Sequence, residues 1–551
     1  MCYPLPASAA RSGEDDVRLF AFGLAAASIA GLTVVSAGQS TPQIQTFRTS
    51  TRLVQVSVVV HDNRNRPIGD LHAEDFRVFE DGKEVKVAFF TEAADRRKVA
   101  AVPREDESTF TNRIPSPSNG GVVVILFDRL NTRQQDQSYA RLQLVKYLQT
   151  LDPTDRVALY VLGSDGFKVL YDFSADAQNL VNVMKGIQPT TSTGMARADR
   201  ALSPALAEGL SAFARGVQQE ERAFDARVRA EQTLFALEDM ADRLAGVPGR
   251  KNVVWVSSHF PFLFASKDIP VPSAHYMTPE TRRVARALND IDTAVYPVDV
   301  RGLIATAPYD PSRVARLRNV EETITGLRML SEWTGGRIFY NTNDLAASAA
   351  QAVEDSRFSY VLGYYPFAGE WDGRFRRIEV KVARPGVNVR HRSGYYAFAL
   401  TPAEPATRQK ALTDALKKPL EATGVLMNVS ARRVEGGIRL AIELGPGTVT
   451  LTSDQGTWKG GIDVAIAQTL PEDRQIREPD FSMPLSLTAA ERDRIVKQGV
   501  RLTRTINLSS DARQVRIVVR DAATGAIGSL IIEADRLRRT AERRETISEA
   551  R

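Results

Sequence analysis

Residues 122–127 form an uninterrupted apolar run, VVVILF, which constrains the fold of this chain more than any other feature. A strand without a polar position has both faces buried, as in the centre of a parallel sheet that helices cover on both sides. Apolar runs then alternate with segments of helical periodicity as far as residue 355, which is typical of such a sheet. We therefore predict an α/β domain over residues 121–357, built on a doubly wound, mostly parallel, Rossmann-like sheet.

The period of the apolar residues predicts the other elements of this domain. Strands are expected at 157–162, 253–256, 294–300 and 337–340, with a hairpin partner at 167–171. Helices are expected at 139–148, 175–185, 196–246, 279–290, 320–333 and 345–355. We expect a break in the long helical stretch near Gly216, because glycine is a poor helix former.

Two β-rich segments flank this domain, at 48–91 and 358–397. The first contains the dipeptide Asp81-Gly82 between two alternating runs, which predicts a two-residue hairpin turn. Neither segment is long enough to be stable alone. We therefore predict that they pack together as one β domain with the α/β domain inserted between them, and that the polar, proline-containing stretch 92–120 is a linker.

The rest of the chain returns to β structure. We expect a linker and a helix over 398–420, and then a β-sandwich-like domain over 421–534 with seven strands and one short helix. Thr488 and Glu491 form the capping-box pattern that starts this helix. The tail 535–551 is rich in both charges and predicts a solvated, partly helical end.

The N-terminus resembles an export signal. Residues 19–37 are uncharged and apolar and end in Val35-Ser36-Ala37, a small-x-small cleavage pattern. We predict that residues 1–37 are a signal peptide and that the protein is periplasmic or extracellular. An uncleaved anchor remains the alternative, because 19 apolar residues can just span a bilayer; a membrane contact is expected only in that case.

Composition excludes several kinds of site and partner. Cys2 is the one cysteine, so disulfides and thiolate metal sites are excluded. The net charge is +6, and the basic residues are spread along the chain, so no nucleic-acid partner is indicated. Ser257-Ser258-His259 invites interpretation as a nucleophile site, but no strand–turn–helix elbow surrounds it. We therefore do not expect an enzyme.

Several motifs carry a family resemblance. The strand and its last carboxylate, VVVILFD, are followed by a later strand that begins after Gly249-Arg250-Lys251-Asn252. The segment at 56–85, VSVVVHDNRNRPIGDLHAEDFRVFEDGKEV, precedes this domain, and SYVLGYYPFAGEWDGRFRRIEVKVARPGVNVRHRSGYY, at 359–396, follows it. Together they resemble the von Willebrand factor A-type proteins that are abundant in Acidobacteria. The resemblance covers about residues 48–397.

The resemblance implies a metal-ion-dependent adhesion site at the end of the first strand. In that site an Asp-x-Ser-x-Ser pattern, a later Thr and a later Asp hold Mg²⁺, which leaves open positions for a ligand carboxylate. Here Asp128 and Thr132 keep the pattern, whereas Leu130 and Ser257 stand where ligands are expected. Thr191 or Thr193 would supply the loop hydroxyl. Further ligand-contact candidates are Asn131, Thr193, Ser257 and Ser258.

Three interpretations of the site therefore stay open: a degenerate Mg²⁺ site, an Asp128 that only caps the following loop, and a polar site that recognises its ligand without metal. We expect an exported adhesion or scaffolding module that binds an unidentified protein through the loops after Asp128 and Ser257. The alternatives are an envelope-polymer hydrolase with its site in the C-terminal β domain and a purely structural envelope protein.

Overall fold

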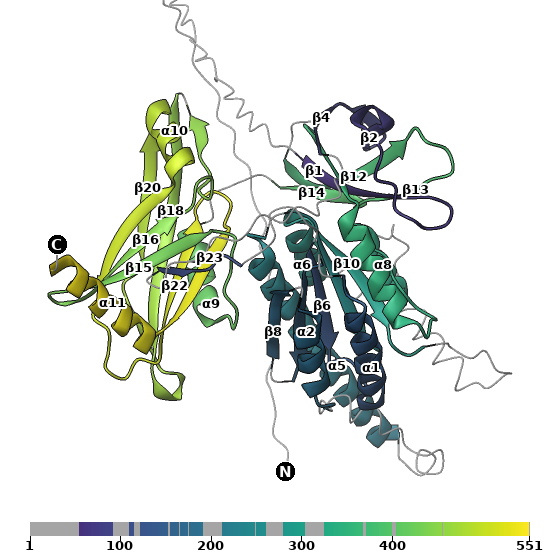
Figure 1. Ribbon diagram of the computed structural model, residues 1–551, viewed down its shortest axis with the longest axis horizontal. Coiled ribbons are helices and arrows are strands. Elements are labelled where there is room, and N and C mark those ends of the chain that lie inside the picture. The colour runs from purple at the N-terminus through teal and green to yellow at the C-terminus, as the bar shows by residue number, and fades with distance from the viewer. Residues whose placement is uncertain are drawn as a thin grey trace, which may run out of the picture. The chain divides into compact units, whose positions relative to one another are not determined.

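The computed structural model describes the part of the chain that is coloured in Figure 1. The described residues are 54–91, 109–114, 122–152, 155–164, 166–174, 176–190, 212–247, 249–260, 279–302, 324–366, 371–398, 404–454 and 456–549. The predicted signal peptide lies outside them. No helix among the described residues is long and apolar enough to cross a membrane. These residues form a mixed α/β protein with several sheets.

The central sheet has five strands in the order β10-β9-β6-β7-β8. Their bounds are β6 Val122–Asp128, β7 Val157–Gly163, β8 Gly166–Ser174, β9 Lys251–Ser257 and β10 Thr293–Asp299. β10, β9, β6 and β7 are parallel, and β8 folds back antiparallel on β7, so the sheet is mixed. Every residue of the four parallel strands is buried, which explains their continuous apolar runs.

Helices contribute to two separate apolar cores against this sheet. One core contains residues of α1 (Gln134–Gln149), α2 (Ala177–Gly186) and α8 (Leu345–Arg357). The other contains residues of α5 (Ala212–Leu244), α6 (Pro279–Asp290) and the helix at 324–334. Successive side chains of a strand point to opposite faces, so Val124 and Ile125 of β6 lie in different cores.

The expected break near Gly216 is wrong. α5 runs without interruption through that residue. A single glycine costs a helix only about 1 kcal/mol relative to alanine. The later turns of α5 contribute Leu234, Leu237 and Met240 to the core, and this burial stabilises the whole helix.

The two flanking β segments pair with each other. One sheet has the order β13-β1-β11-β4 and the other β14-β12-β2-β3. Strands β1 (Val54–His61), β2 (Phe76–Glu80), β3 (Lys83–Val85) and β4 (Val87–Thr91) come from the first segment. Strands β11 (Tyr360–Tyr364), β12 (Asp372–Val382), β13 (Asn388–Arg390) and β14 (Gly394–Phe398) come from the second. The two segments also share one apolar core. Asp81 and Gly82 join β2 to β3 with φ angles of 48° and 80°, as a type I′ turn requires.

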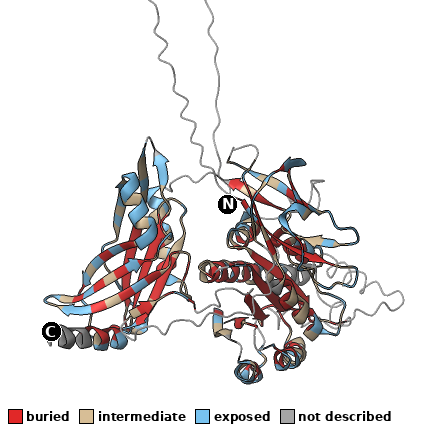
Figure 2. Cartoon of the chain, turned by 45° about the horizontal axis from the view of Figure 1, so that its top comes forward, coloured by how far each residue is buried: buried red, intermediate tan, exposed pale blue. Residues whose placement is uncertain are grey.

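Two sheets also form the C-terminal part of the chain. One has the order β21-β16-β15-β5, and in the other β17, β22, β19 and β20 pair with β18, while β23 pairs with β22. The strands are β15 Met427–Val434, β16 Gly437–Leu444, β17 Thr452–Asp454, β18 Thr457–Thr469, β19 Gln475–Arg477, β20 Phe481–Leu487, β21 Val500–Ile506, β22 Gln514–Asp521 and β23 Ile527–Glu533. Both sheets bury residues in one core, visible as the red inner faces in Figure 2. α9 (Pro405–Lys417) precedes them.

Short helices lie between the strands of these β regions. Thr488 accepts a hydrogen bond from the Glu491 amide and caps α10 (Ala489–Gln498), as its sequence pattern predicts. Two 3₁₀ turns, at Ala73–Asp75 and Pro471–Asp473, connect strands.

Two segments differ from the sequence predictions. The linker at 92–120 contains β5 (Thr109–Thr111), which pairs with β15 and places Phe110 in the C-terminal core. The charged tail is not simply solvated, because α11 (Ala534–Glu549) buries Leu537 and Ala541 in the same core. Both segments are too short or too polar for their few apolar residues to produce a periodic signal.

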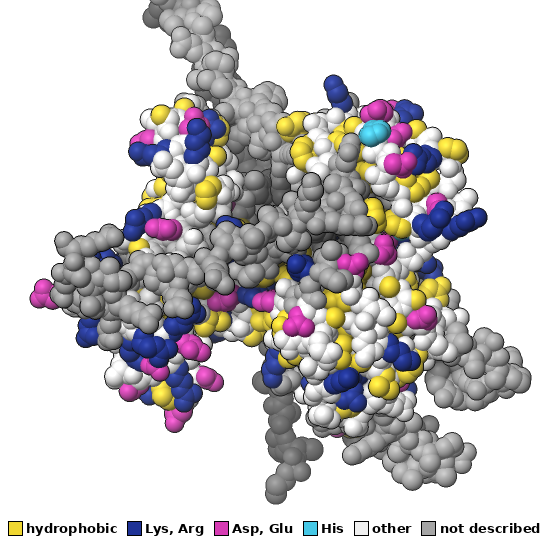
Figure 3. Space-filling model, in the orientation of Figure 1, with side chains coloured by type: hydrophobic (Ala, Val, Ile, Leu, Met, Phe, Trp, Pro, Cys, Tyr) yellow, Lys and Arg dark blue, Asp and Glu magenta, His cyan; other side chains and the backbone are white. Residues whose placement is uncertain are grey.

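Charge on the surface is mixed. The face shown in Figure 3 intersperses lysine and arginine with aspartate and glutamate. On this face the described residues show no large patch of a single sign of the kind that binds a polyanion.

Candidate functional site at the ends of the central strands

The site predicted from the sequence lies where two parallel neighbours end. β6 ends in Asp128, and β9 ends in Ser257. Since Phe127 pairs with Val256, the loops after both strands emerge together. Five of the predicted residues are brought together and are nearly inaccessible to solvent: Asp128, Asn131, Thr132, Ser257 and Ser258. Thr191 and Thr193 lie outside the described residues.

Asp128 is held by nitrogen donors. Its Oδ1 accepts a hydrogen bond from the backbone amide of Asn131 at 3.0 Å. Its Oδ2 accepts from Asn131 Nδ2 at 2.9 Å and from Trp255 Nε1 at 3.1 Å. Burial raises the pKa of Asp128 to about 6, although hydrogen bonds from Asn131, Trp255 and Ser257 oppose the shift. Asp128 therefore closes its own loop and fastens it to β9.

Hydroxyl groups link the two loops. Thr132 Oγ1 lies 3.4 Å from Ser257 Oγ and accepts a hydrogen bond from the Ser258 amide at 3.3 Å. Ser257 Oγ donates to the carbonyl of His259 at 2.7 Å. Ser258 Oγ lies 3.4 Å from the carbonyl of Asn131, to which it donates. The hydroxyl groups of Thr132, Ser257 and Ser258 are thus engaged in hydrogen bonds within the protein.

Arginines surround these loops, although none of them was among the residues predicted for the site. Burial, together with the charges of Arg133, Arg301 and Arg229, lowers the pKa of His259 to about 4. Arg301 forms an ion pair with Asp299, at 2.6 Å from Nη2 to Oδ2, and Asp299 is the last residue of β10. Arg301 follows the carboxyl end of a predicted strand, so the rule that pointed to Asp128 could have found it.

Arg229 reaches the same place from α5. Burial lowers the pKa of its guanidinium, and the charges of Asp225 and Asp128 raise it. Its Nη1 is buried and makes no hydrogen bond with the described residues. It lies 101 positions from Asp128 in the sequence, so no local pattern could have indicated it.

The described residues do not fit a divalent cation. Mg²⁺ requires several hard oxygen ligands and keeps open positions. Here both Asp128 oxygens face N–H donors, Leu130 is apolar and buried, and Ser257 Oγ is directed to a carbonyl. Among the described residues, no group of three or more histidine, cysteine, aspartate or glutamate side chains could hold a metal ion.

Ser258 and His259, which follow the end of β9, contact each other. Ser258 Oγ lies 3.1 Å from His259 Nδ1. The serine is fully buried, and an imidazole with a pKa of about 4 is a weak general base near neutral pH. The pair is therefore suited to holding the loop and not to activating a nucleophile.

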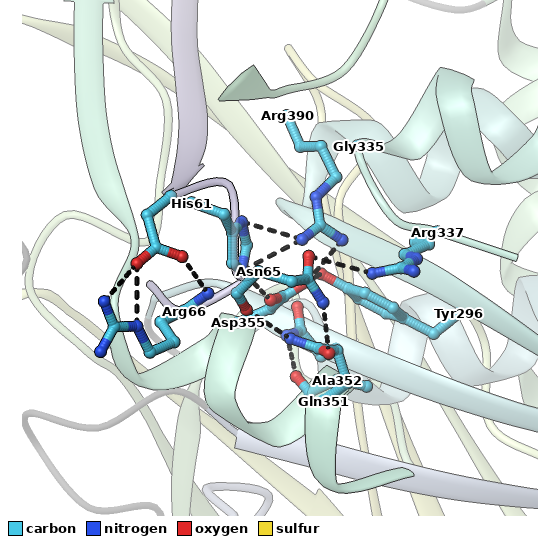
Figure 4. A network of polar contacts seen from close by, with 12 residues as sticks. His61, Asn65, Arg66, Tyr296, Gly335, Arg337, Gln351, Ala352, Asp355 and Arg390 are labelled. Atoms are coloured by element: carbon cyan, nitrogen blue, oxygen red, sulfur yellow. Dashed lines mark hydrogen bonds and ion pairs between the residues drawn. The ribbon is translucent and has the colours of Figure 1, made fainter. Parts of the chain in front are cut away.

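A second polar cluster lies where the β domain contacts α8 (Figure 4). Asp355 accepts a hydrogen bond from Tyr296 at 3.0 Å and forms an ion pair with Arg390 at 3.0 Å. His61 Nε2 lies 2.8 Å from its other oxygen. Arg250 donates to Tyr296 and to the carbonyl of Gly335. The cluster joins residues from both β segments to the central sheet.

No protein-family model and no curated protein matches the chain. Among solved structures it is similar to proximal thread matrix protein 1 from the mussel byssus, with 10% identity and a TM-score of 0.21. That match covers 43% of this chain and 46% of the mussel protein, so the chain spans less than half of that protein's length.

Von Willebrand factor A-type domains are also among the solved structures that match, all at low similarity. The VWA domain of SpRpn10 is 8% identical, with a TM-score of 0.19, over 41% of this chain and 94% of that one. The pilus adhesin SpaC from Lactobacillus rhamnosus GG is 9% identical, with a TM-score of 0.25, over 86% of this chain and 58% of that one. VWA domains are thus weak structural neighbours of this chain.

Proposed function

We propose that this chain is an exported, non-catalytic protein-binding module whose central domain has the doubly wound, von Willebrand factor A-type arrangement. Four parallel strands with cores on both faces support this arrangement. Polar loops at the carboxyl ends of β6, β9 and β10 support a binding role, because ligands of such sheets bind there. The module acts without a metal ion.

One observation carries the proposal: Arg229 lies near the satisfied carboxylate of Asp128 and has a buried Nη1 without a hydrogen-bond partner among the described residues. In the metal-dependent sites that the sequence resembles, the cation receives the carboxylate of the partner. Here Arg133, Arg229 and Arg301 act on His259 of the same loops, and since Arg301 is already paired with Asp299, Arg229 is the guanidinium that we assign to the partner's carboxylate. Guanidinium groups bind carboxylates through paired, charge-assisted hydrogen bonds. The partner is therefore a protein that presents an acidic side chain.

Site-specific photo-crosslinking in the native host tests this function. A photoreactive amino acid replaces Gln134, an exposed residue beside Arg133, and adducts are isolated from the exported fraction. The matched control places the same group at Arg374, which is 81% exposed on β12 of the β domain. The expected result is a discrete protein adduct at position 134 that EDTA does not reduce and that the control position lacks.

Two outcomes would count against the proposal. Equal adducts at both positions, or none at position 134, would contradict the placement of the binding face at these loops. Loss of the adduct in EDTA, with recovery in Mg²⁺, would show that binding depends on metal. Replacing Arg229 with glutamine is expected to weaken the adduct at least about tenfold, because a charge-assisted hydrogen bond contributes about 1.5–3 kcal/mol.

A further inference from the structure

A cavity of about 370 Å³ lies at the edge of the central sheet, beyond β10. Residues 337–340 line one side, and the first turns of α8 line the other. These residues play no part in the Asp128 loops, so a role for this cavity is independent of the proposed function.

Residues 337–340 form no regular strand, but Phe339 makes one isolated parallel bridge with Val298 of β10 and leaves an open hydrogen-bonding edge on the side of the cavity. Phe339 donates its amide to the carbonyl of Pro297 at 2.8 Å, and its carbonyl accepts from the amide of Asp299 at 2.9 Å. Backbone groups of alternate residues in a strand point to opposite sides. The amide and carbonyl of Ile338 therefore point away from β10, and they have no backbone partner among the described residues. Such an edge is a template for another strand.

The cavity lining also contains one cation, Arg337, and one carboxylate, Asp344. Arg337 is half-buried, donates to Asn65 Oδ1 at 3.2 Å and lies over the ring of Phe339. No described carboxylate forms an ion pair with it. Burial and the nearby charge of Arg390 lower the pKa of Arg337, although the charges of Asp355 and Tyr296 oppose the shift. A bound carboxylate would supply Arg337 with a charged hydrogen-bond partner.

Among the described residues, no other lining residue forms an ion pair with Arg337. Asp344, the acidic residue of the lining, keeps its charge and caps α8, where its Oδ1 accepts a hydrogen bond from the Ala347 amide at 2.8 Å. Gln351, another lining residue, accepts a hydrogen bond from Asn65 Nδ2 at 2.6 Å (Figure 4). Ala347 is exposed at the cavity and leaves room for an incoming chain.

We propose that this edge binds an acidic peptide segment in an extended conformation. The peptide pairs with the outward backbone groups of Ile338 and places a carboxylate on Arg337. Main-chain pairing supplies affinity, and the side-chain position at Arg337 supplies specificity, as in other cases of strand addition. A peptide is favoured over a small anion because the cavity combines a cation with an open strand edge.

Selection from a linear heptapeptide library displayed on phage tests this site with the purified exported chain. The expected consensus is an aspartate or glutamate between β-branched residues. A selected peptide, made synthetically, should bind the Arg337→Gln variant at least about tenfold more weakly than the wild type. Ala347→Trp, which fills the cavity from an exposed helix position, should abolish binding while leaving the thermal unfolding midpoint unchanged.

The matched control is Arg227→Gln, which removes an arginine that is 70% exposed on α5, and it should leave the affinity unchanged. Failure to enrich any peptide would overturn the proposal. So would selected peptides without an acidic residue, or peptides that bind both cavity variants as tightly as the wild type.

Discussion

Asp355 Oδ1 lies 2.8 Å from Nε2 of His61, and neither side chain is exposed to solvent. The two residues are 294 positions apart in the sequence. His61 is the last residue of the first β-domain strand, and Asp355 lies near the end of α8 in the α/β domain. This contact ties the β domain to the domain inserted within it.

Replacing Asp355 with alanine should lower the free energy of unfolding by about 3–5 kcal/mol, because it leaves buried partners without their counter-charge. Urea unfolding followed by circular dichroism measures this change. Glu379→Ala is the control: Glu379 is 53% exposed and paired with Lys381, so its removal should cost less than about 1 kcal/mol. Similar losses for both variants would contradict the role assigned to Asp355.

Replacing Asp128 with asparagine should remove one pH dependence of stability. The folded-state pKa of Asp128, about 6, lies above the ordinary aspartate value of 3.8, so the folded protein binds more protons between these values. Its contribution to stability therefore falls as pH rises from 4 to 6.5, by about 2 kcal/mol. Urea unfolding of both proteins across this range should show the wild type losing stability relative to Asp128→Asn. Parallel curves would refute the raised pKa.

Replacing His259 with glutamine should give the opposite trend. The folded-state pKa of about 4 lies below the ordinary histidine value of 6.5, so the unfolded chain binds more protons in this window. His259 therefore contributes its full stabilisation above pH 6.5. This contribution to the free energy of unfolding is lost as pH falls to 4, by about 3 kcal/mol. The wild type should lose stability relative to His259→Gln on acidification. The pH dependences that Asp128 and His259 contribute to stability have opposite signs. The unfolding free energy of the wild type alone would therefore reveal neither of them.

Divalent cations should not bind at the Asp128 loops. Isothermal titration of Mg²⁺ and Mn²⁺ into the purified chain should give no saturable heat that Asp128→Ala removes, because N–H donors face the carboxylate oxygens. The thermal unfolding midpoint should be the same in excess Mg²⁺ and in EDTA. A stoichiometric, Asp128-dependent binding isotherm would show that the loops rearrange to accept metal.

Export should be accompanied by cleavage after Ala37. N-terminal sequencing of the protein from the periplasmic or extracellular fraction should begin at Gly38, since Val35-Ser36-Ala37 matches the small-x-small pattern. Changing Ala37 to arginine should block processing. Recovery of the unprocessed chain from the membrane fraction of wild-type cells would favour the anchor instead.

Local sequence patterns determined much of the fold. The apolar run 122–127 specifies a strand buried on both faces, Asp81-Gly82 specifies a tight turn, and Thr488 with Glu491 specifies the start of a helix. Each of these signals depends on interactions within a few residues, so the sequence alone contains the necessary information. The position of Asp128 at a strand end is determined in the same way.

Tertiary structure decided what those elements do together. It joined Phe110 and Leu537 to the C-terminal core, brought Arg229 and Arg301 to the Asp128 loops, and turned N–H donors toward the carboxylate. The sequence places Asp128 at the site, but whether its oxygens meet a cation or amide groups depends on residues as distant as Trp255. Burial and charge act through space, so the chemistry of this site is set by the packing of segments that no local pattern connects.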